Sequence, residues 1–432
     1  MATGLSLILF IFLLILLSLG IWVAPALITL GYILLEFFTP APVGSLLAST
    51  LWDASWNWAL TALPLFIWMG EILFRTRLSS EMFKGLAPML SNLPGGLLHV
   101  NVVGCGIMAA VAGSSAVTCA TIGRMSIPEL KKRNYDETLS IGSLAGSGTL
   151  GLLIPPSIML IVYGVLAQVS ISRLFIAGVL PGIMIIIIFM TYIIIRSKLN
   201  PALAPKQEVR YTLWEKIKAA RNLLPVLALI FFVLGSIYGG YATPTEAATI
   251  GVIGALLLAW SSKTLNKNSF IDSLMGAVKT SCMINFIIVG AAFLSVAMGY
   301  TGIPKQLGQL VSDFELSRLS LLAILTLLYI FLGCFLEGTS MMVLTASVVL
   351  PMVQIAGIDL IWFGIFTVVV VEMAQITPPV GFNLFVLQGM TGRDILKVTK
   401  AALPFFFLML LSIVILIIFP EIVTAPVNFM IQ

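Results

Sequence analysis

Charged residues are scarce in this chain. Asp, Glu, Lys and Arg make up 9% of its 432 residues, whereas soluble domains carry about 25%. Hydrophobic residues make up 59%, and the mean hydropathy is +1.11. The apolar runs mostly reach the roughly 17–25 residues that span a bilayer, and they recur along the whole chain. These properties exclude a soluble protein and predict an all-α polytopic membrane protein.

Histidine and cysteine are also rare, which limits metal and redox chemistry. His99 is the only histidine, so we expect no zinc or haem site held by histidine. The cysteines lie in apolar segments without CxxC spacing, so we expect small buried side chains and neither a disulfide nor a metal site. These cysteines are Cys105, Cys119, Cys282 and Cys334.

Motifs of enzymes and of ATP-driven pumps are missing too. The chain has no Walker A motif, no HExxH and no GxSxG. Its net charge of +5 comes from Lys and Arg that lie mostly in short loops, which is not a signal for nucleic acid. We therefore expect neither an enzyme nor a nucleic-acid partner, and an ion gradient rather than ATP as the source of energy.

The chain does contain a pattern of prolines that occurs twice, 223 residues apart (351 − 128). A glycine-led break, at 113–115 and at 338–340, accompanies each copy. Proline and glycine free backbone groups that lipid cannot satisfy, so such breaks persist only where protein or a watery cavity covers them. Paired broken helices in two halves of a membrane protein indicate a transporter's binding site. The paired prolines are Pro128 and Pro351, Pro155 and Pro378, Pro156 and Pro379, and Pro181 and Pro404.

These breaks divide the chain into two similar halves. Each half is predicted to contain a re-entrant helical hairpin followed by a broken transmembrane helix. The segment 196–221 is the most polar and is predicted to be a cytoplasmic loop, and residues 5–38 should form two short spans joined near Gly20. The predicted divisions are N-terminal scaffold helices at 1–56; a first repeat at 57–195 with its hairpin at 96–128 and its broken span at 138–168; the loop and further scaffold helices at 196–282; and a second repeat at 283–432 with its hairpin at 319–352 and its broken span at 359–390.

Charge predicts how the halves face the membrane. The flanks of the first hairpin, 75–95 and 129–137, carry six Lys and Arg, whereas those of the second, 300–318 and 353–358, carry only two. Because cytoplasmic loops are enriched in Lys and Arg, the first hairpin should open from the cytoplasm and the second from the opposite side. The prediction is an inverted-topology repeat, the architecture of secondary transporters, with the C-terminus in the periplasm.

The tips of the two hairpins offer groups that bind ions. A break leaves free carbonyls at one half-helix end and free N–H groups at the other. Carbonyls and hydroxyls suit a small hard cation, and N–H groups suit a carboxylate. The competing interpretation is that small residues merely let helices approach closely, but two tips with matched broken spans favour a cation site. The tip hydroxyls belong to Ser114, Ser115, Thr339 and Ser340.

Each tip is expected to face the broken span of its own half. Ser157 follows the first break and Asn383 the second; each either hydrogen-bonds a substrate or satisfies backbone groups that the break frees. The first broken span contributes Gly148, Gly151, Ile154 and Pro156, and the offset of 223 carries these onto Val371, Ala374, Thr377 and Pro379.

Acidic residues inside apolar sequence need a physical reason. For residues 243–246, Thr-Pro-Thr-Glu, the predicted reason is a helix start with a capping box. Glu337 and Glu372 lie inside apolar spans, and Glu337 either strengthens a cation site or pairs within the bundle. Glu71 is expected to face the membrane interface.

Four motifs occur in a specific order: Ala112-Gly113-Ser114-Ser115, Gly148-Thr149 through Ile154-Pro155-Pro156-Ser157, Tyr241-Ala242-Thr243-Pro244-Thr245-Glu246-Ala247-Ala248, and Ile376-Thr377-Pro378-Pro379-Val380-Gly381. With them, nearly the whole chain resembles the large membrane subunit of the tripartite ATP-independent periplasmic (TRAP) transporters. The resemblance implies a sodium-coupled, elevator-type importer of an organic acid in the bacterial inner membrane. Sialic acid is the first substrate candidate and a C4-dicarboxylate the second.

The resemblance also implies a small four-helix membrane subunit and a periplasmic substrate-binding protein as partners, within membrane lipid. A stand-alone sodium/anion symporter without a binding protein, or a passive channel subunit, are the alternatives. The residues implied at the sodium sites are Ser114, Ser115, Gly151, Ile154 and Pro156, and Gly338, Thr339, Thr377 and Pro379. The candidates for substrate contact are Ser115, Ser157, Ser340 and Asn383.

Overall fold

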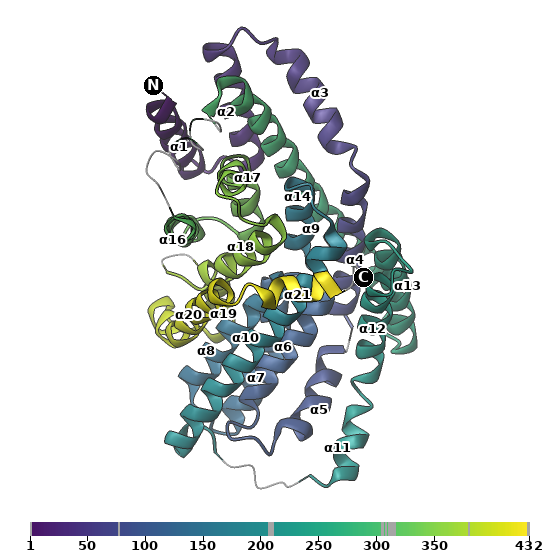
Figure 1. Cartoon of the computed structure of the whole chain (residues 1–432). Helices are drawn as coiled ribbons and strands as arrows, with labels where there is room; N and C mark the ends of the chain where they lie inside the picture. Colours follow the sequence, from purple (N-terminus) through teal and green to yellow (C-terminus); the bar gives the residue numbers. More distant parts are fainter. Residues whose placement is uncertain are drawn as a thin grey trace.

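The computed structural model is a bundle of helices (Figure 1). It describes residues 2–76, 78–205, 211–303, 306, 309, 317–378 and 381–429, and within these ranges all regular structure is helical. The all-α prediction is confirmed. Pro379 and most of the segment 303–316 lie outside the described residues.

The N-terminal helices pack on one long helix. α1 (Ala2–Ser18) and α2 (Val23–Phe38) are separated at Gly20, whose φ of +78° favours glycine, so the predicted break is confirmed. α2 packs along α14 (Lys267–Thr301), near α3 (Val43–Ser55) at one end of the molecule (Figure 1). A Cβ built on Gly290 of α14 would lie 2.9 Å from the carbonyl oxygen of Ala24, so this glycine allows the two helices to approach closely.

The first predicted hairpin has its break where the sequence placed it, but the break of the following span, predicted to begin at Gly146, begins only after Thr149. After η1 (Trp58–Thr61), α4 (Ala62–Phe74) and α5 (Leu78–Leu90), the hairpin helices are α6 (Leu98–Ala112) and α7 (Ser115–Lys132). The span divides into α8 (Glu137–Thr149), the 3₁₀ turn η2 (Leu150–Leu152) and α9 (Ile158–Leu166). α10 (Ile171–Leu199) follows.

The second half has helices and breaks in the same order. Its hairpin helices are α16 (Arg318–Gly333) and α17 (Gly338–Ile355), and its span divides into α18 (Leu360–Ala374) and α19 (Phe382–Thr391). α20 (Ile395–Ile418) and α21 (Glu421–Phe429) follow. The break at the first tip is thus confirmed, whereas the second break lies at 334–337, and Gly338, Thr339 and Ser340 form the first turn of α17. The opposite orientation of the halves and their division into repeats stay predictions.

The connecting region supplies further helices and confirms the predicted capping box. It contains η3 (Pro201–Leu203), α11 (Leu213–Ala220), α12 (Leu224–Tyr238) and α13 (Pro244–Ser261). At the start of α13, the main-chain N–H of Thr243 donates to Glu246 Oε2 (2.7 Å), and the N–H of Glu246 donates to Thr243 Oγ1 (3.4 Å). Glu246 is therefore a helix-start residue rather than a transport carboxylate.

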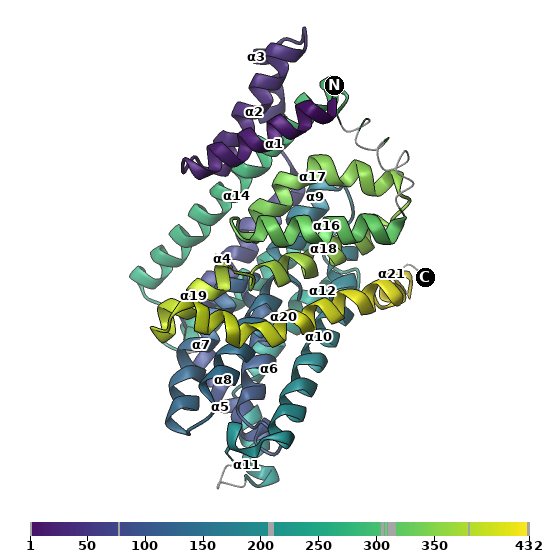
Figure 2. The same ribbon diagram turned by 90° about the vertical axis from the view of Figure 1, so that its left-hand side faces the viewer.

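The two halves are interleaved rather than side by side. α18 is buried from Trp362 to Ala374, which is typical of a helix at the centre of a bundle. It packs beside α16 and α17 and against α20 (Figure 2), and also against α9 and α10 of the first half. The hydroxyl of Tyr163 on α9 donates to the carbonyl oxygen of Leu360 at the start of α18 (2.6 Å). The two broken spans are therefore in direct contact.

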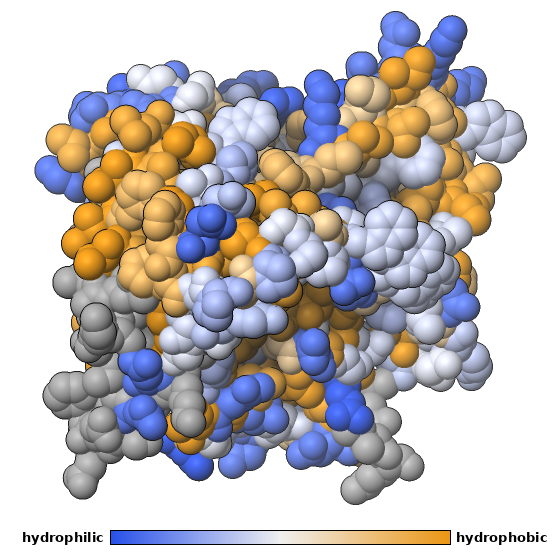
Figure 3. Space-filling model, turned by 90° about the horizontal axis from the view of Figure 1, so that it is seen from above, coloured by the Kyte–Doolittle hydropathy of each residue, from blue (hydrophilic) through white to orange (hydrophobic). Residues whose placement is uncertain are grey.

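The outer surface suits a membrane. Among the described residues, five helices are long and apolar enough to cross a bilayer, or up to seven if each bent pair counts as one span. Viewed from the α2–α3 end, apolar residues reach the rim in two places with more polar residues between them (Figure 3). Cys105, Cys119 and Cys334 are buried as predicted, but Cys282 is exposed on α14, so the prediction of burial was wrong there. Burial was expected because Cys282 lies in an apolar helix, but in a membrane protein an apolar helix face can be covered by lipid instead of protein.

Candidate functional site

The first hairpin tip is a sharp reversal between two helix ends. Gly113 ends α6 in the left-handed region, with φ +61°, and its N–H donates to the Ala109 carbonyl (3.1 Å). Ser114 is extended and begins α7, and its side chain makes no capping bond. Ser115, the first residue of α7, is buried. The tip therefore presents a helix C-terminus and a helix N-terminus next to each other, with opposite partial charges.

The first broken span lies directly on this tip. A Cβ built on Gly151 would lie 2.5 Å from the Ser114 carbonyl oxygen and 2.8 Å from the Ser115 nitrogen, so only glycine fits there. A Cβ on Gly113 would lie 3.1 Å from the Pro156 carbonyl oxygen. The structure thus brings together four of the five residues implied for the first sodium site. The side chain of the fifth, Ile154, packs instead towards Gly106 and Gly182.

The second tip is capped by an acid. Glu337 precedes α17, and its carboxylate accepts from the Ser340 main-chain N–H (3.2 Å), the Thr339 hydroxyl (3.0 Å) and the Ser340 hydroxyl (3.4 Å). The Thr377 hydroxyl donates to the Met373 carbonyl (3.0 Å). The structure makes Glu337 the N-cap of α17, at the edge of the cavity described next, which is neither of the two roles expected from the sequence.

Both tips line one cavity of about 110 Å³. Gly113 and Ser114 come from the first tip, and Glu337 and Thr339 come from the second. Thr280 of α14 and the η2 residue Leu152 also line it. Polar residues of both hairpin tips, among them Ser114, Glu337 and Thr339, therefore converge on a space bounded on one side by the long helix α14. Ser115, Ser157, Ser340 and Asn383 are not among its lining residues.

Glu71 belongs to this cavity, contrary to the expectation that it faces the membrane interface. Its side chain is 20% exposed, pairs with Arg75 (3.2 Å) and lines the cavity. A Cβ built on Gly276 of α14 would lie 2.8 Å from the Glu71 carboxyl carbon, so that glycine makes room for it. The sequence does show an acid inside an apolar span, which is usually functional. Because Glu71 is far along the chain from both helix breaks, the sequence did not indicate that it lines the same cavity.

Ser157 and Asn383, the residues that follow the two breaks, differ in their hydrogen bonding. Ser157 caps α9: its hydroxyl accepts from the Leu160 N–H (3.2 Å) and donates to the Leu152 carbonyl. Ser157 therefore satisfies backbone groups freed by the break. Asn383 is fully buried, and neither its amide oxygen nor its amide nitrogen has a partner among the described residues.

In the second half, too, a glycine allows the broken span and the hairpin to pack closely. Ala374 occupies the corresponding position, and it lies against Gly333 of α16, where a built Cβ would be 3.2 Å from the Ala374 Cα. In the first half the glycine at this contact is on the broken span (Gly151), whereas in the second half it is on the hairpin helix (Gly333). Loss of the span glycine therefore does not prevent close packing of the second tip.

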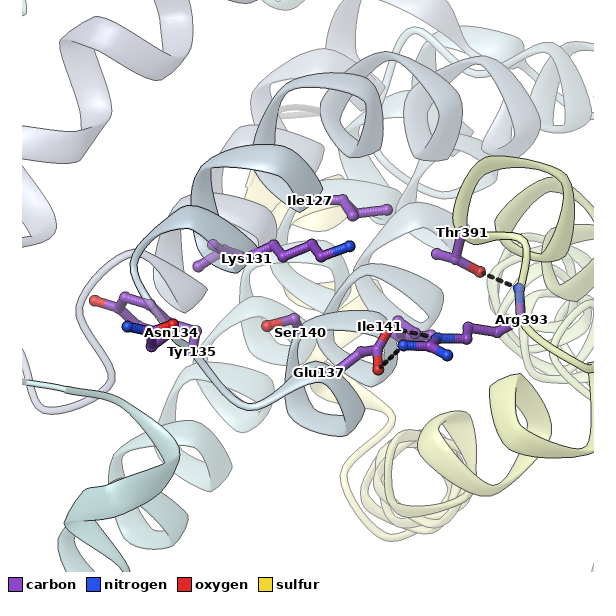
Figure 4. Close-up of a pocket in the computed structure, with 10 residues that line it drawn as sticks. Ile127, Lys131, Asn134, Tyr135, Glu137, Ser140, Ile141, Thr391 and Arg393 are labelled. Carbon is purple, nitrogen blue, oxygen red and sulfur yellow. Dashed lines mark hydrogen bonds and ion pairs between the residues drawn. The ribbon is translucent and has the colours of Figure 1, made fainter.

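A second cavity, of about 340 Å³, lies where the two halves meet near the ends of α7, α8 and α19 (Figure 4). There Arg393 donates through Nε and an Nη to both carboxylate oxygens of Glu137 (2.7 and 2.8 Å), and these bonds raise the pKa of Arg393 above its ordinary value. Lys131 also lines the cavity (Figure 4). The ion pair joins the start of α8 in the first half to the residue after α19 in the second half, and neither hairpin tip lines this cavity.

Comparison with known proteins agrees with this architecture. The family model described as "Tripartite ATP-independent periplasmic transporter, DctM component" matches residues 10–422. The C4-dicarboxylate TRAP transporter large permease protein DctM of Pseudomonas aeruginosa is 32% identical over 403 residues, 93% of each chain. The sialic acid TRAP transporter large permease protein SiaM of Vibrio cholerae is 27% identical over 372 residues, 84% of this chain and 85% of the other. The solved structure of the YdaH transporter of Alcanivorax borkumensis has a TM-score of 0.63 at 14% identity, covers 93% of this chain and 98% of its own, and bears on the fold alone.

Proposed function

The chain belongs to the DctM component of the tripartite ATP-independent periplasmic transporters, and from that premise we propose that it imports an organic acid together with sodium ions. The family makes it a large permease of the bacterial inner membrane, a transporter rather than an enzyme. The observation that carries the proposal is the cavity shared by the two hairpin tips, where helix poles of both signs meet.

Sodium is proposed to bind at the tips, where the residues fit a small hard cation. In the first half, the missing Cβ of Gly151 leaves the Ser114 carbonyl and the Ser115 main chain against the broken span. Carbonyl and hydroxyl oxygens are the ligands that such cations prefer. The proposed first set is Ser114, Ser115, Gly151, Ile154 and Pro156; the second is Gly338, Thr339 and Thr377, with Pro379 outside the described residues.

The substrate is proposed to bind through its carboxylate between the tips. A lone carboxylate costs several kcal/mol to desolvate, and bound cations beside it offset that cost. The relatives named for C4-dicarboxylates are 31–32% identical to this chain, and those named for sialic acid are 27–28% identical. We therefore rank a C4-dicarboxylate ahead of sialic acid, the reverse of the order expected from the sequence.

Transport is proposed to proceed by sliding of the hairpins and broken spans against the remaining helices. α14, which borders the cavity and also packs along α2 and α4, suits the stationary side. The expected partners are a small four-helix membrane subunit that widens this stationary side and a periplasmic binding protein that delivers the acid. The C-terminus is proposed to lie in the periplasm.

Uptake into proteoliposomes that contain the large and small subunits tests the proposal. With the binding protein outside, radiolabelled succinate should accumulate under an inward sodium gradient and sialic acid should accumulate less. Replacing sodium with potassium on both sides should abolish accumulation. Uptake that continues unchanged in potassium contradicts sodium coupling, and uptake without any binding protein favours the stand-alone symporter.

A further inference from the structure

A cavity of about 420 Å³ lies where several helix ends of the second half meet. Its lining comes from the start of α16, the link between α17 and α18, the start of α18, and the junction of α20 with α21. α18 packs against α16, α20 and α21, and the four helices lie together in Figure 2. The volume is within the roughly 300–1,000 Å³ of small-molecule sites. Neither hairpin tip lines this cavity, so it is separate from the transport site proposed above.

The length of α20 puts this cavity near the membrane surface. α20 is an apolar helix of 24 residues and is long enough to cross a bilayer. At 1.5 Å per residue it extends about 36 Å, more than the roughly 30 Å of the hydrocarbon core, so its end reaches the headgroup region. Ile417 and Pro420, at the C-terminal end of α20, line the cavity. Trp362 also lines it, and tryptophan is enriched at membrane–water boundaries.

Two oppositely charged side chains line the cavity without pairing with each other. Among its described lining residues, only Arg318 and Asp359 are charged. An Nη of Arg318 lies 3.4 Å from the position of a Cβ built on Gly357, so the guanidinium is beside the link that leads to Asp359. None of the ion pairs among the described residues includes either charge. One oxygen of Asp359 accepts from the Trp362 main-chain N–H (2.8 Å) as the N-cap of α18, which leaves the other oxygen for a ligand.

A buried hydrogen-bond donor accompanies the two charges. Trp362 is 7% exposed, and its indole N–H has no partner among the described residues. Its ring stacks on Phe366, with 5.4 Å between the ring centroids, and this contact holds the indole in place. Because buried polar groups are normally hydrogen-bonded, the indole N–H calls for an acceptor that the described residues do not supply.

Apolar surface adjoins these polar groups. Leu319, Leu322 and Ile358 line the cavity. Leu319 is 62% exposed, and Ile418, next to the lining residue Ile417, is 60% exposed. Lipid tails cover such side chains in a membrane protein. The cavity therefore has a polar part with one positive and one negative charge, beside an apolar surface, which is the division found in a phospholipid.

We propose that this cavity binds the headgroup of a phosphatidylethanolamine molecule from the surrounding membrane. Its phosphate accepts from the Arg318 guanidinium and the Trp362 indole N–H, and its ammonium donates to the free oxygen of Asp359. An anionic lipid would place a phosphate near Asp359 with no cation between them, which is unfavourable. Phosphatidylcholine has no N–H to donate to the carboxylate. The pair of opposite charges therefore selects a zwitterionic headgroup with a free ammonium.

Lipid binding to the purified complex of large and small subunits tests the site without a sodium gradient or a substrate. The complex is stripped of lipid in detergent, mixed with radiolabelled phosphatidylethanolamine and counted after gel filtration. Wild type should retain one more lipid per large subunit than Arg318→Gln. The matched control is Arg173→Gln, because Arg173 is also an exposed arginine near the start of a helix, α10, but does not line the cavity. This control should retain as much lipid as wild type.

Competition with unlabelled compounds identifies the ligand. In wild type, phosphatidylglycerol and phosphatidylcholine should displace the retained lipid roughly ten times less effectively than phosphatidylethanolamine. Asp359→Asn keeps a good N-cap residue but removes the charge, so the advantage over phosphatidylglycerol should disappear. Glycerophosphoethanolamine, the same headgroup without acyl chains, should not displace the lipid at equal concentration. Displacement by it would show that a soluble phosphate compound is the ligand and would overturn the proposal.

Two other results would also overturn the site. One is equal retention of lipid by wild type and by Arg318→Gln that unfolds at a normal temperature, and the other is an unchanged headgroup preference in Asp359→Asn. Should Arg318→Gln not fold, Trp362→Phe keeps an aromatic ring but removes the indole N–H. Weaker retention of the lipid by Trp362→Phe supports the inference, and unchanged retention overturns it.

Discussion

Substitution of Gly151 by alanine should weaken sodium binding by displacing the first hairpin tip. The new Cβ would lie 2.5 Å from the Ser114 carbonyl oxygen and 2.8 Å from the Ser115 nitrogen. Both are main-chain atoms, so no side-chain rotation relieves the contact. Ordinary contact distances begin near 3.4 Å, and the tip and the broken span must therefore separate by roughly 1 Å.

The size of the effect follows from the cost of overpacking. Inserting a methyl group into a filled site typically costs about 1–3 kcal/mol. If the tip must return to its position to hold the ion, the same free energy is taken from sodium binding. An energy of about 1–3 kcal/mol raises the half-saturating sodium concentration roughly 5- to 150-fold.

Sodium-dependent uptake in proteoliposomes measures this directly, with sodium varied at a fixed substrate concentration. Gly389→Ala is the matched control, because a Cβ at Gly389 in α19 meets nothing within 4 Å and alanine favours a helix. Thermal unfolding of each variant in detergent shows that it is folded. An unchanged sodium dependence in folded Gly151→Ala would refute the placement of the ion at this tip.

Three further predictions concern stability and the second tip. Thr243→Ala removes the N-cap of α13 and should cost about 1 kcal/mol, seen as a lower unfolding temperature in detergent; no change contradicts the capping role. The Arg393–Glu137 pair is about half exposed and screened by solvent, so a double-mutant cycle with Arg393→Ala and Glu137→Ala should give only a weak coupling energy, and a strong coupling would show that the pair holds the halves together. Glu337→Gln keeps part of the N-cap but removes its charge at the cavity, so sodium affinity should fall more than stability; an equal fall in both would indicate a capping role alone.

Local features of this fold could be predicted from the sequence because they depend on neighbouring residues. Glycine and proline are common at helix ends, and from them the breaks at 113–114 and 375–381 and the link at Gly20 could be predicted. They do not suffice alone, because Pro128, Pro181, Pro351 and Pro404 lie inside helices. The capping box at Thr243 is a four-residue pattern with a single geometry. Helix order and break positions therefore required no tertiary information.

Contacts between distant segments could not be predicted in this way. The Tyr163 hydroxyl reaches Leu360 across 197 residues, and no hydrophobic period encodes such a pairing. Glu71 was misplaced for the same reason, since its position depends on Gly276 of α14. The contact between Ala374 and Gly333 could not be predicted either. A comparison of the two halves position by position assumes that equivalent residues have equivalent partners, and here the glycine is on the hairpin helix instead of the broken span.

The opposite orientation of the two hairpins is the claim on which the account depends most. In a cysteine-free variant, single cysteines at Lys131 and Arg318 can be labelled with a membrane-impermeant thiol reagent in right-side-out and inside-out vesicles. The account predicts that Lys131→Cys reacts only from the cytoplasmic side and Arg318→Cys only from the periplasmic side. Labelling of both from the same side would contradict it.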